Sequence, residues 1–306
     1  MGFVKNNFKL DFLCVGFQKC ATTTLDTLLG QHSCIALPTI KEIHLEEWGG
    51  QCGNPLEVIE RKFFADSNYI NKKIGIIDPN LRDCPREIRK KIGKDIKLIF
   101  IMRNPVDRLF SYYKMALKLG FSDVYQSTLY GKEMSNVRKS FGRYVREELI
   151  KENKAFPILW GNYIDVIMEF SKYFERDKMF FIIFEDFIHN PEKIARELFE
   201  FLSLPYEEVK FKIWEFSGNR ISKNALCFKI NSTIIFMREK SRCNINASTK
   251  QFNKIDNFFN NVAKLTTKEN NERMSIGTRK QLERYYDDSI RKLEAFLGVD
   301  LSEKWF

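Results

Sequence analysis

Residues 96–102 (IKLIFIM) limit the possible folds of this chain more than any other feature. A short, almost continuous apolar run bounded by polar residues is typical of a strand that is buried on both faces of a parallel sheet. Asn104 and Pro105 follow, and because Asn is a preferred N-cap and Pro fits the first helical turn, we expect a helix to start there and to run to about Leu119. The segment therefore predicts a buried strand leading directly into a helix.

The same alternation of short apolar runs and helical patterns recurs along the chain. Strands that alternate with helices indicate an α/β fold with a mainly parallel central sheet. The 306 residues contain no repeat and no sharp break in composition, so we expect a single domain over residues 1–306. The other expected strands are residues 11–17, 35–37, 73–78 and 179–184. The other expected helices are residues 22–31, about 137–153, 163–174, 190–202 and 278–297, with Gly298 as the stop signal of the last.

Charge and cysteine content restrict the class of protein. The formal net charge of +10 favours an anionic ligand, a nucleic acid or a membrane surface. The 50 basic residues are scattered among 40 acidic ones, however, whereas a nucleic-acid-binding module requires clustered Lys and Arg with interleaved aromatic residues, so we expect no nucleic-acid partner. Seven cysteines without a CxxC pair argue against a zinc ribbon or a disulfide framework and favour a reducing compartment. No apolar run reaches the ~20 residues of a membrane span, so we expect a cytoplasmic protein without membrane insertion.

The segment between the first expected strand and the first expected helix has the composition of an anion-binding loop. Backbone N–H groups at a helix N-terminus, together with the helix dipole, favour an anion, and a lysine and three threonines add a positive charge and hydroxyl donors. The order of residues is not that of a Walker A loop, which counts against a P-loop kinase-like enzyme dependent on Mg²⁺. A Thr-rich helix cap beside a solvated lysine is the alternative. The candidate residues are Gln18, Lys19, Cys20, Ala21, Thr22, Thr23 and Thr24.

A second candidate site follows the strand at residues 96–102. Arg103 stands at the C-terminal end of this strand, where open α/β sheets bind ligands. Ser111 comes seven residues after Asn104, close to two helical turns, so it shares a face with the start of the helix. A guanidinium group and a hydroxyl group can bind one phosphate together through hydrogen bonds. A structural ion pair of Arg103 and an incidental Ser111 are the alternative.

The two segments QKCATTTL and RNPVDRLFSYY resemble the two nucleotide-binding motifs of PAPS-dependent sulfotransferases (PAPS is 3′-phosphoadenosine 5′-phosphosulfate). The resemblance implies a three-layer, P-loop-like fold with a central parallel sheet. It also implies that the first segment holds the 5′-phosphosulfate and that Arg103 and Ser111 hold the 3′-phosphate. Residues 157–205 look like the family's later helix–strand–helix, and residues 274–305 look like the C-terminal end of its carbohydrate-directed members. The implied reaction sulfates a glycan or glycolipid hydroxyl, releases PAP and needs no metal.

Residues 41–48 (KEIHLEEW) are similar to a Glu-x-His segment of heparan-type sulfotransferases. By this resemblance Glu42 is the general base, and His44 is a neighbouring polar group. A general base must reach the acceptor proton, and its pKa should lie near neutrality. Two alternatives remain open: an exposed charged turn, and His44 as the base, as in sulfotransferases that act on small alcohols and phenols. We expect His32 and His189 at helix boundaries.

The implied mechanism is an in-line transfer between two oxygens, in which the protein positions the reactants and stabilises charge. Lys19 would neutralise the bridging oxygen as PAP leaves. The sequence departs from the heparan-type pattern at Ile77, Asp78 and Pro79, where that group often has Lys-Ser-Pro or Lys-Thr-Pro. The lysine of that motif is missing, and Asp78 is a candidate for binding a sugar hydroxyl instead. A pseudoenzyme that binds PAP without turnover is a further alternative.

Overall fold

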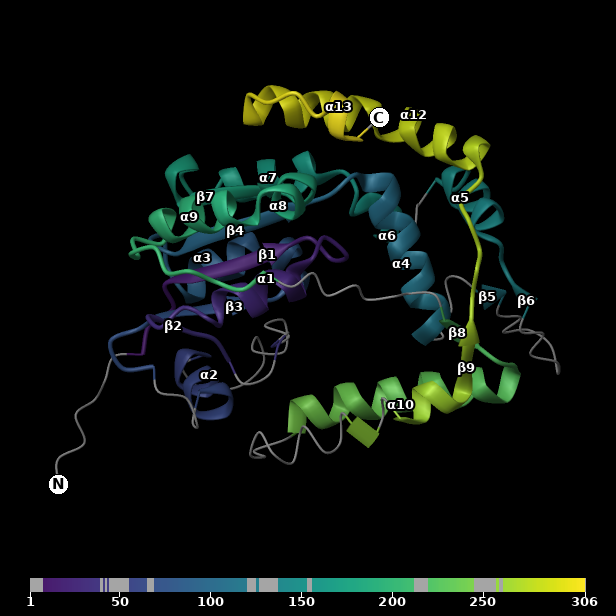
Figure 1. The fold of residues 1–306 in the computed structure, drawn as a ribbon, viewed down its shortest axis with the longest axis horizontal. Helices are drawn as coiled ribbons and strands as arrows, with labels where there is room; N and C mark the ends of the chain where they lie inside the picture. The colour runs from purple at the N-terminus through teal and green to yellow at the C-terminus, as the bar shows by residue number, and fades with distance from the viewer. Residues whose placement is uncertain are drawn as a thin grey trace. The chain divides into compact units, whose positions relative to one another are not determined.

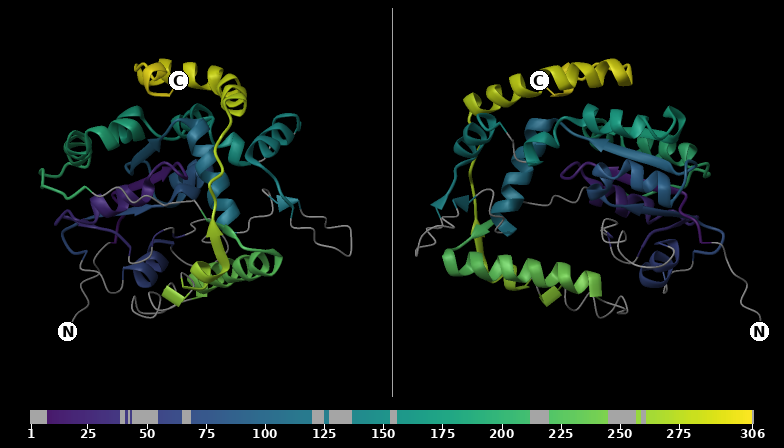
Figure 2. Two further views of the ribbon diagram at one scale, coloured as in Figure 1. Left: turned by 45° about the vertical axis from the view of Figure 1, so that its right-hand side comes forward. Right: turned by 180° about the vertical axis from the view of Figure 1, so that it is seen from behind.

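The computed structural model describes residues 8–38, 41, 43, 55–64, 69–119, 125–126, 137–152, 156–211, 220–244, 257–258 and 261–305. The chain divides into two compact units, shown in Figures 1 and 2. We call Met1–Arg103 with Tyr163–Trp214 the sheet unit, and Asn104–Asn162 with Glu215–Phe306 the helical unit. The division concerns compactness and not independent folding, so the single domain over residues 1–306 stays a prediction.

A five-stranded sheet in the order β2-β3-β1-β4-β7 forms the centre of the sheet unit. Every neighbouring pair of its strands is parallel. The expected strands and the mainly parallel sheet are therefore confirmed. The strands are β1 Phe12–Gly16, β2 Ile35–Ala36, β3 Lys73–Ile77, β4 Lys97–Met102 and β7 Met179–Ile183.

Close packing between β1 and β3 explains one glycine in the sheet. All five residues of β1 are buried, as expected for a strand that is covered on both faces. Phe12 pairs with Gly75 of β3, and a Cβ atom on Gly75 would come within 2.0 Å of Cζ of Phe12. Position 75 therefore needs glycine so that the Phe12 ring can lie over the neighbouring strand.

Helices cover both faces of the sheet. The connection from β1 through α1 to β2 and that from β3 through α3 to β4 run in opposite directions along the sheet. Because such crossovers are right-handed, α1 and α3 lie on opposite faces, which gives three layers. α3 packs against α7, and α8 and α9 pack against β7 (Figure 1). The helices of this unit are α1 Thr22–Leu29, α2 Pro55–Phe63, the 3₁₀ helix η2 Pro79–Asp83, α3 Pro85–Lys91, α7 Tyr163–Ser171, the 3₁₀ helix η4 Arg176–Lys178, α8 Phe184–His189 and α9 Pro191–Phe201.

The helical unit is organised around α4, which contacts α6, α10, α12 and β8. Polar contacts connect it to the C-terminal part of the chain: Asn104 Nδ2 donates to the carbonyl oxygen of Trp305, and Arg279 pairs with Asp107. The elements are α4 Pro105–Leu119, β5 Tyr125–Gln126, β6 Val137–Arg138, α5 Phe141–Leu149, α6 Phe156–Leu159, β8 Arg220–Ser222, α10 Ala225–Asn244, β9 Thr267–Glu269, α12 Ile276–Leu297 and α13 Ser302–Trp305.

The predicted helix ends are confirmed by their capping contacts. Asn104 Oδ1 accepts the N–H of Val106 at 2.9 Å at the start of α4, and Asn190 Oδ1 accepts the N–H of Lys193 at 3.2 Å at the start of α9. Gly298 follows α12 in the left-handed conformation, with φ of 69°, which glycine adopts readily. None of the described helices combines the length and the apolar character that crossing a bilayer requires.

Candidate nucleotide-binding site

The loop between β1 and α1 lies at the point of the sheet where a ligand is expected. From β1 the chain continues to β2 on one side, whereas from β4 it continues to β7 on the other. Neighbouring strands whose connections leave in opposite directions open a crevice at their carboxyl ends, and open α/β sheets bind ligands in this crevice. The N–H of Phe17 donates to the carbonyl oxygen of Ile101 at 2.8 Å, which joins the start of the loop to β4. The first candidate segment therefore begins beside the C-terminal end of β4.

The backbone of this loop has an unusual conformation. Lys19 and Ala21 have φ values of 71° and 68°, in the left-handed region that residues other than glycine rarely adopt. Alternation of such residues with ordinary ones makes a concave row of N–H groups that suits an anion. Ala21 is also the N-cap of α1, with no side-chain cap and no acidic residue in the first turn. The loop therefore has the backbone of an anion-binding site at the positive end of a helix dipole.

A lysine that the sequence analysis did not select lies on this helix start. Lys41 Nζ donates to Thr23 Oγ1 at 2.9 Å and to Thr22 Oγ1 at 3.2 Å. Thr22 is 6% exposed, and Thr23 is half-buried. Thr24 is buried at 3% exposure, and its role as a hydroxyl donor to a ligand stays a prediction. The sequence signal for Lys41 is its position directly before Glu42 in the KEIH segment.

A buried tyrosine joins the loop to the end of β4. The hydroxyl of Tyr163 donates to the carbonyl oxygen of Arg103 at 2.7 Å and lies 3.8 Å from the sulfur of Cys20, which is fully buried. Its ring packs on Phe17 with a centroid distance of 4.5 Å. Tyr163 is 1% exposed and is the first residue of α7. One side chain thus fixes both candidate segments of the sheet unit, although the sequence analysis did not select it.

Polar groups elsewhere in the loop are only partly buried. Gln18 and Lys19 are both half-buried, and Gln18 Oε1 is itself buried without a hydrogen-bond partner in the part of the chain that the structure describes.

The thiol of Cys14 lies in β1, close to this loop. Burial raises the pKa of the Cys14 thiol to about 12, while its hydrogen bond to the carbonyl of Gly16 and the charge of Lys41 act in the opposite direction. The Cys14 thiol is therefore protonated at neutral pH, and it is not a nucleophile.

The two residues of the second candidate site fall in different units. Arg103 follows β4 directly and is half-buried, and its guanidinium carbon lies 4.6 Å from the centroid of the Phe184 ring. Such a cation–π contact holds the planar group in one orientation. Ser111 is a half-buried residue of α4 in the helical unit. Joint binding of a phosphate by Arg103 and Ser111 stays a prediction.

The residues predicted for proton transfer lie outside the described residues. Glu42 and His44 are both in this group, whereas Ile43 between them is described and buried at 4% exposure. The structure does describe Asp78, which is fully buried and accepts the N–H of Asn80 at 3.0 Å. Asp78 is the N-cap of η2. It has no exposed surface for a sugar hydroxyl, so this interpretation of Asp78 was wrong.

The two other histidines lie at helix boundaries, as predicted. His32 follows α1, and its Nε2 lies 2.9 Å from the carbonyl oxygen of Pro205. His189 is the last residue of α8, and its Nδ1 lies 2.7 Å from the carbonyl oxygen of Glu185. Both rings therefore complete backbone hydrogen bonding where helices end.

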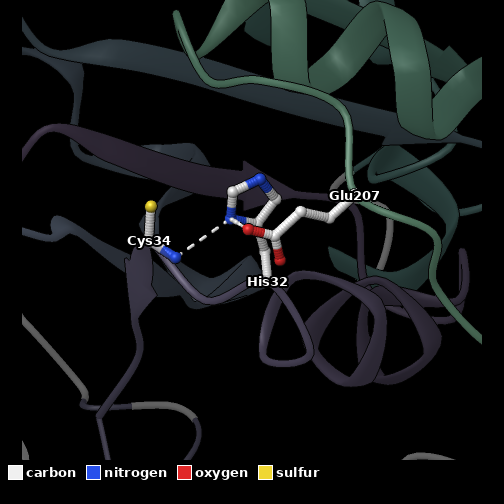
Figure 3. Close-up of side chains that lie close together, drawn as sticks. All are labelled: His32, Cys34 and Glu207. Carbon is white, nitrogen blue, oxygen red and sulfur yellow. Dashed lines mark hydrogen bonds and ion pairs between the residues drawn. The ribbon is translucent and has the colours of Figure 1, made fainter.

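His32 is also part of a polar cluster with Cys34 and Glu207, whose possible ligand atoms lie within 4.8 Å of one another (Figure 3). His32 Nδ1 accepts the N–H of Cys34 at 3.1 Å, and Glu207 accepts the N–H of Ser33 at 2.8 Å and its hydroxyl. The hydrogen bonds from Ser33 hold the pKa of the Glu207 carboxyl below its usual value. These contacts hold the segment after α9 against the turn between α1 and β2.

The family model described as "Sulfotransferase domain" matches residues 9–254. A sulfotransferase structure from Alicyclobacillus acidocaldarius aligns with a TM-score of 0.61 at 19% identity, covering 96% of this chain and 98% of that one. The mouse sulfotransferase SULT7A1 complexed with PAP aligns with a TM-score of 0.48 at 13% identity, covering 93% and 86% of the two chains. The comparison with curated protein sequences found no match. The bacterial structure supports the fold described above.

Proposed function

The chain belongs to the sulfotransferase family, and on this basis we propose that it transfers a sulfuryl group from PAPS to a hydroxyl of a carbohydrate or glycoconjugate and releases PAP. The observation that carries the proposal is the β1–α1 loop. Its left-handed residues Lys19 and Ala21 stand before an uncapped helix start, and Lys41 lies on the first turn of that helix. This arrangement suits a strongly anionic group such as a phosphosulfate.

Each end of the donor has its own residues in this proposal. The β1–α1 loop and the first turn of α1 bind the 5′-phosphosulfate through backbone N–H groups, Lys19 and the hydroxyls of Thr22 and Thr23. Arg103 and Ser111 bind the 3′-phosphate, for which a guanidinium fork is well suited. The orientation of Arg103 is supported on two sides, by the Phe184 ring beneath its guanidinium and by the Tyr163 hydroxyl on its carbonyl oxygen.

The chemistry is a single in-line displacement at sulfur. The acceptor oxygen forms a bond to sulfur while the bond between sulfur and the bridging phosphosulfate oxygen breaks, and its electron pair stays on the 5′-phosphate of PAP. Glu42 takes the proton of the acceptor hydroxyl as the general base, with His44 as the alternative base. Lys19 stabilises the charge that develops on the leaving oxygen, so the proposal assigns no role to a metal.

The choice of acceptor rests on the resemblance of residues 41–48 and 274–305 to carbohydrate-directed sulfotransferases. A small alcohol or phenol is the competing acceptor class, and it goes with His44 as the base. Cys14, Cys34 and Cys227 are free thiols in the part of the chain that the structure describes, which fits a reducing compartment, and the cytoplasm is the location that we propose.

Thermal denaturation with nucleotides tests the donor. PAP at a hundredfold excess over its Kd stabilises a folded protein that binds it by about 2.7 kcal/mol, which raises the melting temperature. We expect this shift with PAP and no comparable shift with ATP and Mg²⁺. The opposite pattern would favour a kinase-like nucleotide enzyme.

Turnover with radiolabelled PAPS tests the acceptor. The purified protein is incubated with a panel of glycans and glycolipids and, in parallel, with small alcohols and phenols. We expect label to enter the glycan panel. Transfer to phenols alone would move the acceptor to the competing class, and PAP binding without transfer to any acceptor would indicate a pseudoenzyme.

A further inference from the structure

Lys41 lies where the transferred group of the donor would be held, and it was not among the residues expected to hold it. We propose that Lys41 binds the sulfuryl group of PAPS and supplies a charge that the end of β3 lacks. This inference rests on the proposed function, because it assumes that PAPS is the donor. It adds a second lysine beside Lys19 to the binding of the phosphosulfate.

The hydrogen bonds of Lys41 fix the position of its ammonium group. Nζ lies 2.9 Å from Thr23 Oγ1 and 3.2 Å from Thr22 Oγ1, and both hydroxyls belong to the first turn of α1. The side chain of Lys41 is half-buried, so its charge is only partly screened by solvent. The ammonium therefore lies beside the uncapped N–H groups that begin this helix.

A cation in this position is favourable when an anion shares the site. The N-terminus of a helix carries the positive end of the helix dipole, and cations are stabilising at the opposite end. Lys41 therefore adds a positive charge to the first turn of α1, where the helix dipole is already positive. A dianionic phosphosulfate at this helix start is attracted both by the ammonium group and by the dipole.

The carboxyl end of β3 does not provide this charge. Ile77 ends the strand at 1% exposure, and Asp78 is fully buried. Ile77 is the register partner of Cys14 in β1, and the N–H of Asp78 donates to the carbonyl oxygen of Cys14 at 3.0 Å. The Lys41 charge lies close enough to the Cys14 thiol to offset part of the rise in its pKa that burial causes. Lys41 thus supplies a positive charge near the carboxyl ends of the strands, where Ile77 and Asp78 at the end of β3 supply none.

The two lysines have separate tasks in this arrangement. Lys19 precedes the helix and serves the bridging oxygen, which remains on PAP. Lys41, on the hydroxyls of Thr22 and Thr23, contacts the nonbridging sulfuryl oxygens, which leave with the acceptor. PAP has no sulfuryl group, so Lys41 should distinguish PAPS from PAP and Lys19 should contribute to both.

Comparison of PAP and PAPS binding tests this assignment. Affinities are measured by isothermal titration calorimetry for the wild type, Lys41→Met, Lys41→Arg and the control Lys193→Met, which removes a lysine that is 66% exposed on α9. We expect Lys41→Met to weaken PAPS by about tenfold or more, as for one lost bond to a charged group, and PAP by less than about threefold. Lys41→Arg keeps the charge and should recover most of the PAPS affinity, and Lys193→Met should behave as the wild type.

The possible outcomes separate the two proposals. A wild-type protein that binds neither ligand refutes the proposed function. If the wild type binds PAP and Lys41→Met weakens PAP and PAPS equally, or weakens neither, the function stands and the role of Lys41 is refuted. Melting temperatures report whether Lys41→Met folds; if it does not, Lys41→Gln, which keeps a polar end group without the charge, gives the same comparison.

Discussion

The buried hydroxyl of Tyr163 provides a sharp test of how the site is built. Tyr163→Phe removes one oxygen atom and keeps the ring, so the packing on Phe17 at 4.5 Å is preserved. The lost contacts are the hydrogen bond to the carbonyl oxygen of Arg103 at 2.7 Å and the contact with the sulfur of Cys20 at 3.8 Å. We expect the variant to fold and to bind PAP more weakly.

The size of the effect follows from these contacts. A neutral hydrogen bond contributes ~0.5–1.5 kcal/mol, so the free energy of unfolding should fall by about 1 kcal/mol. Arg103 makes a charge-assisted bond to the 3′-phosphate in our proposal, worth ~1.5–3 kcal/mol when well aligned. Without the Tyr163 hydrogen bond, the backbone at Arg103 is held less firmly. If Arg103 then loses about half of the binding free energy of its bond to the 3′-phosphate, PAP binding weakens by about 1 kcal/mol, or roughly fivefold.

A matched control exists in the helical unit. Tyr286 is fully buried, and its hydroxyl donates to the carbonyl oxygen of Ile158 at 2.8 Å. Tyr286→Phe therefore removes the same kind of bond at similar burial, together with a contact to the Arg108 guanidinium, without removing a residue of the proposed site. The assay combines chemical denaturation with calorimetric titration of PAP and of AMP, which lacks the 3′-phosphate. Both variants should lose similar stability, but only Tyr163→Phe should weaken PAP, and it should weaken AMP by less than about twofold.

Two results would refute this reasoning. If Tyr163→Phe and Tyr286→Phe weaken PAP equally, the loss reflects general destabilisation. If Tyr163→Phe weakens PAP and AMP by the same factor, the Tyr163 hydroxyl does not act through a residue that binds the 3′-phosphate. Arg103 would then have to be assigned a different ligand group.

Two further predictions address the remaining site residues. Arg103→Ala should weaken the binding of PAP by at least about tenfold and that of adenosine 5′-phosphosulfate much less, because only PAP has the 3′-phosphate. Ser111→Ala should act in the same direction. Calorimetry that shows equally weakened binding of both ligands would contradict this role. Glu42→Gln keeps size and polarity but accepts no proton, so kcat should fall by ~10²–10⁴ while PAPS binding stays near that of the wild type. An active Glu42→Gln beside an inactive His44→Asn, assayed with one acceptor, would make His44 the base and favour small alcohols or phenols as acceptors.

The sheet could be predicted because its determinants are local. Strands that are covered on both faces are continuous apolar runs, and β4 and β7 have this pattern. Helix starts at Asn104 and Asn190 and the stop at Gly298 follow from single residues with specific capping chemistry. The helix α10 was not predicted, because its apolar and polar residues do not separate into two faces and the surrounding segment is rich in polar residues.

The candidate site was predicted to the extent that it consists of contiguous residues. The sequence placed Lys19 between β1 and α1 and the threonines at the start of the helix, and the structure has them there. It also placed Arg103 directly after β4, as found. The left-handed conformations of Lys19 and Ala21 were not predictable, because neither residue type favours them and the surrounding fold imposes them.

The residues that the sequence analysis missed have roles that arise from contacts across the sheet unit. Lys41 reaches α1 hydroxyls 18 and 19 positions earlier in the chain, and the Tyr163 hydroxyl meets the Arg103 carbonyl 60 positions earlier. A lysine in a charged segment and a tyrosine at a helix start are ordinary when considered alone. They become informative because β1 and β4 are neighbours whose connections diverge, so the segments after both strands must be held at one edge of the sheet. The strand order therefore requires side chains that connect the segments at this edge of the sheet. Only the folded structure shows that Lys41 and Tyr163 are among these side chains.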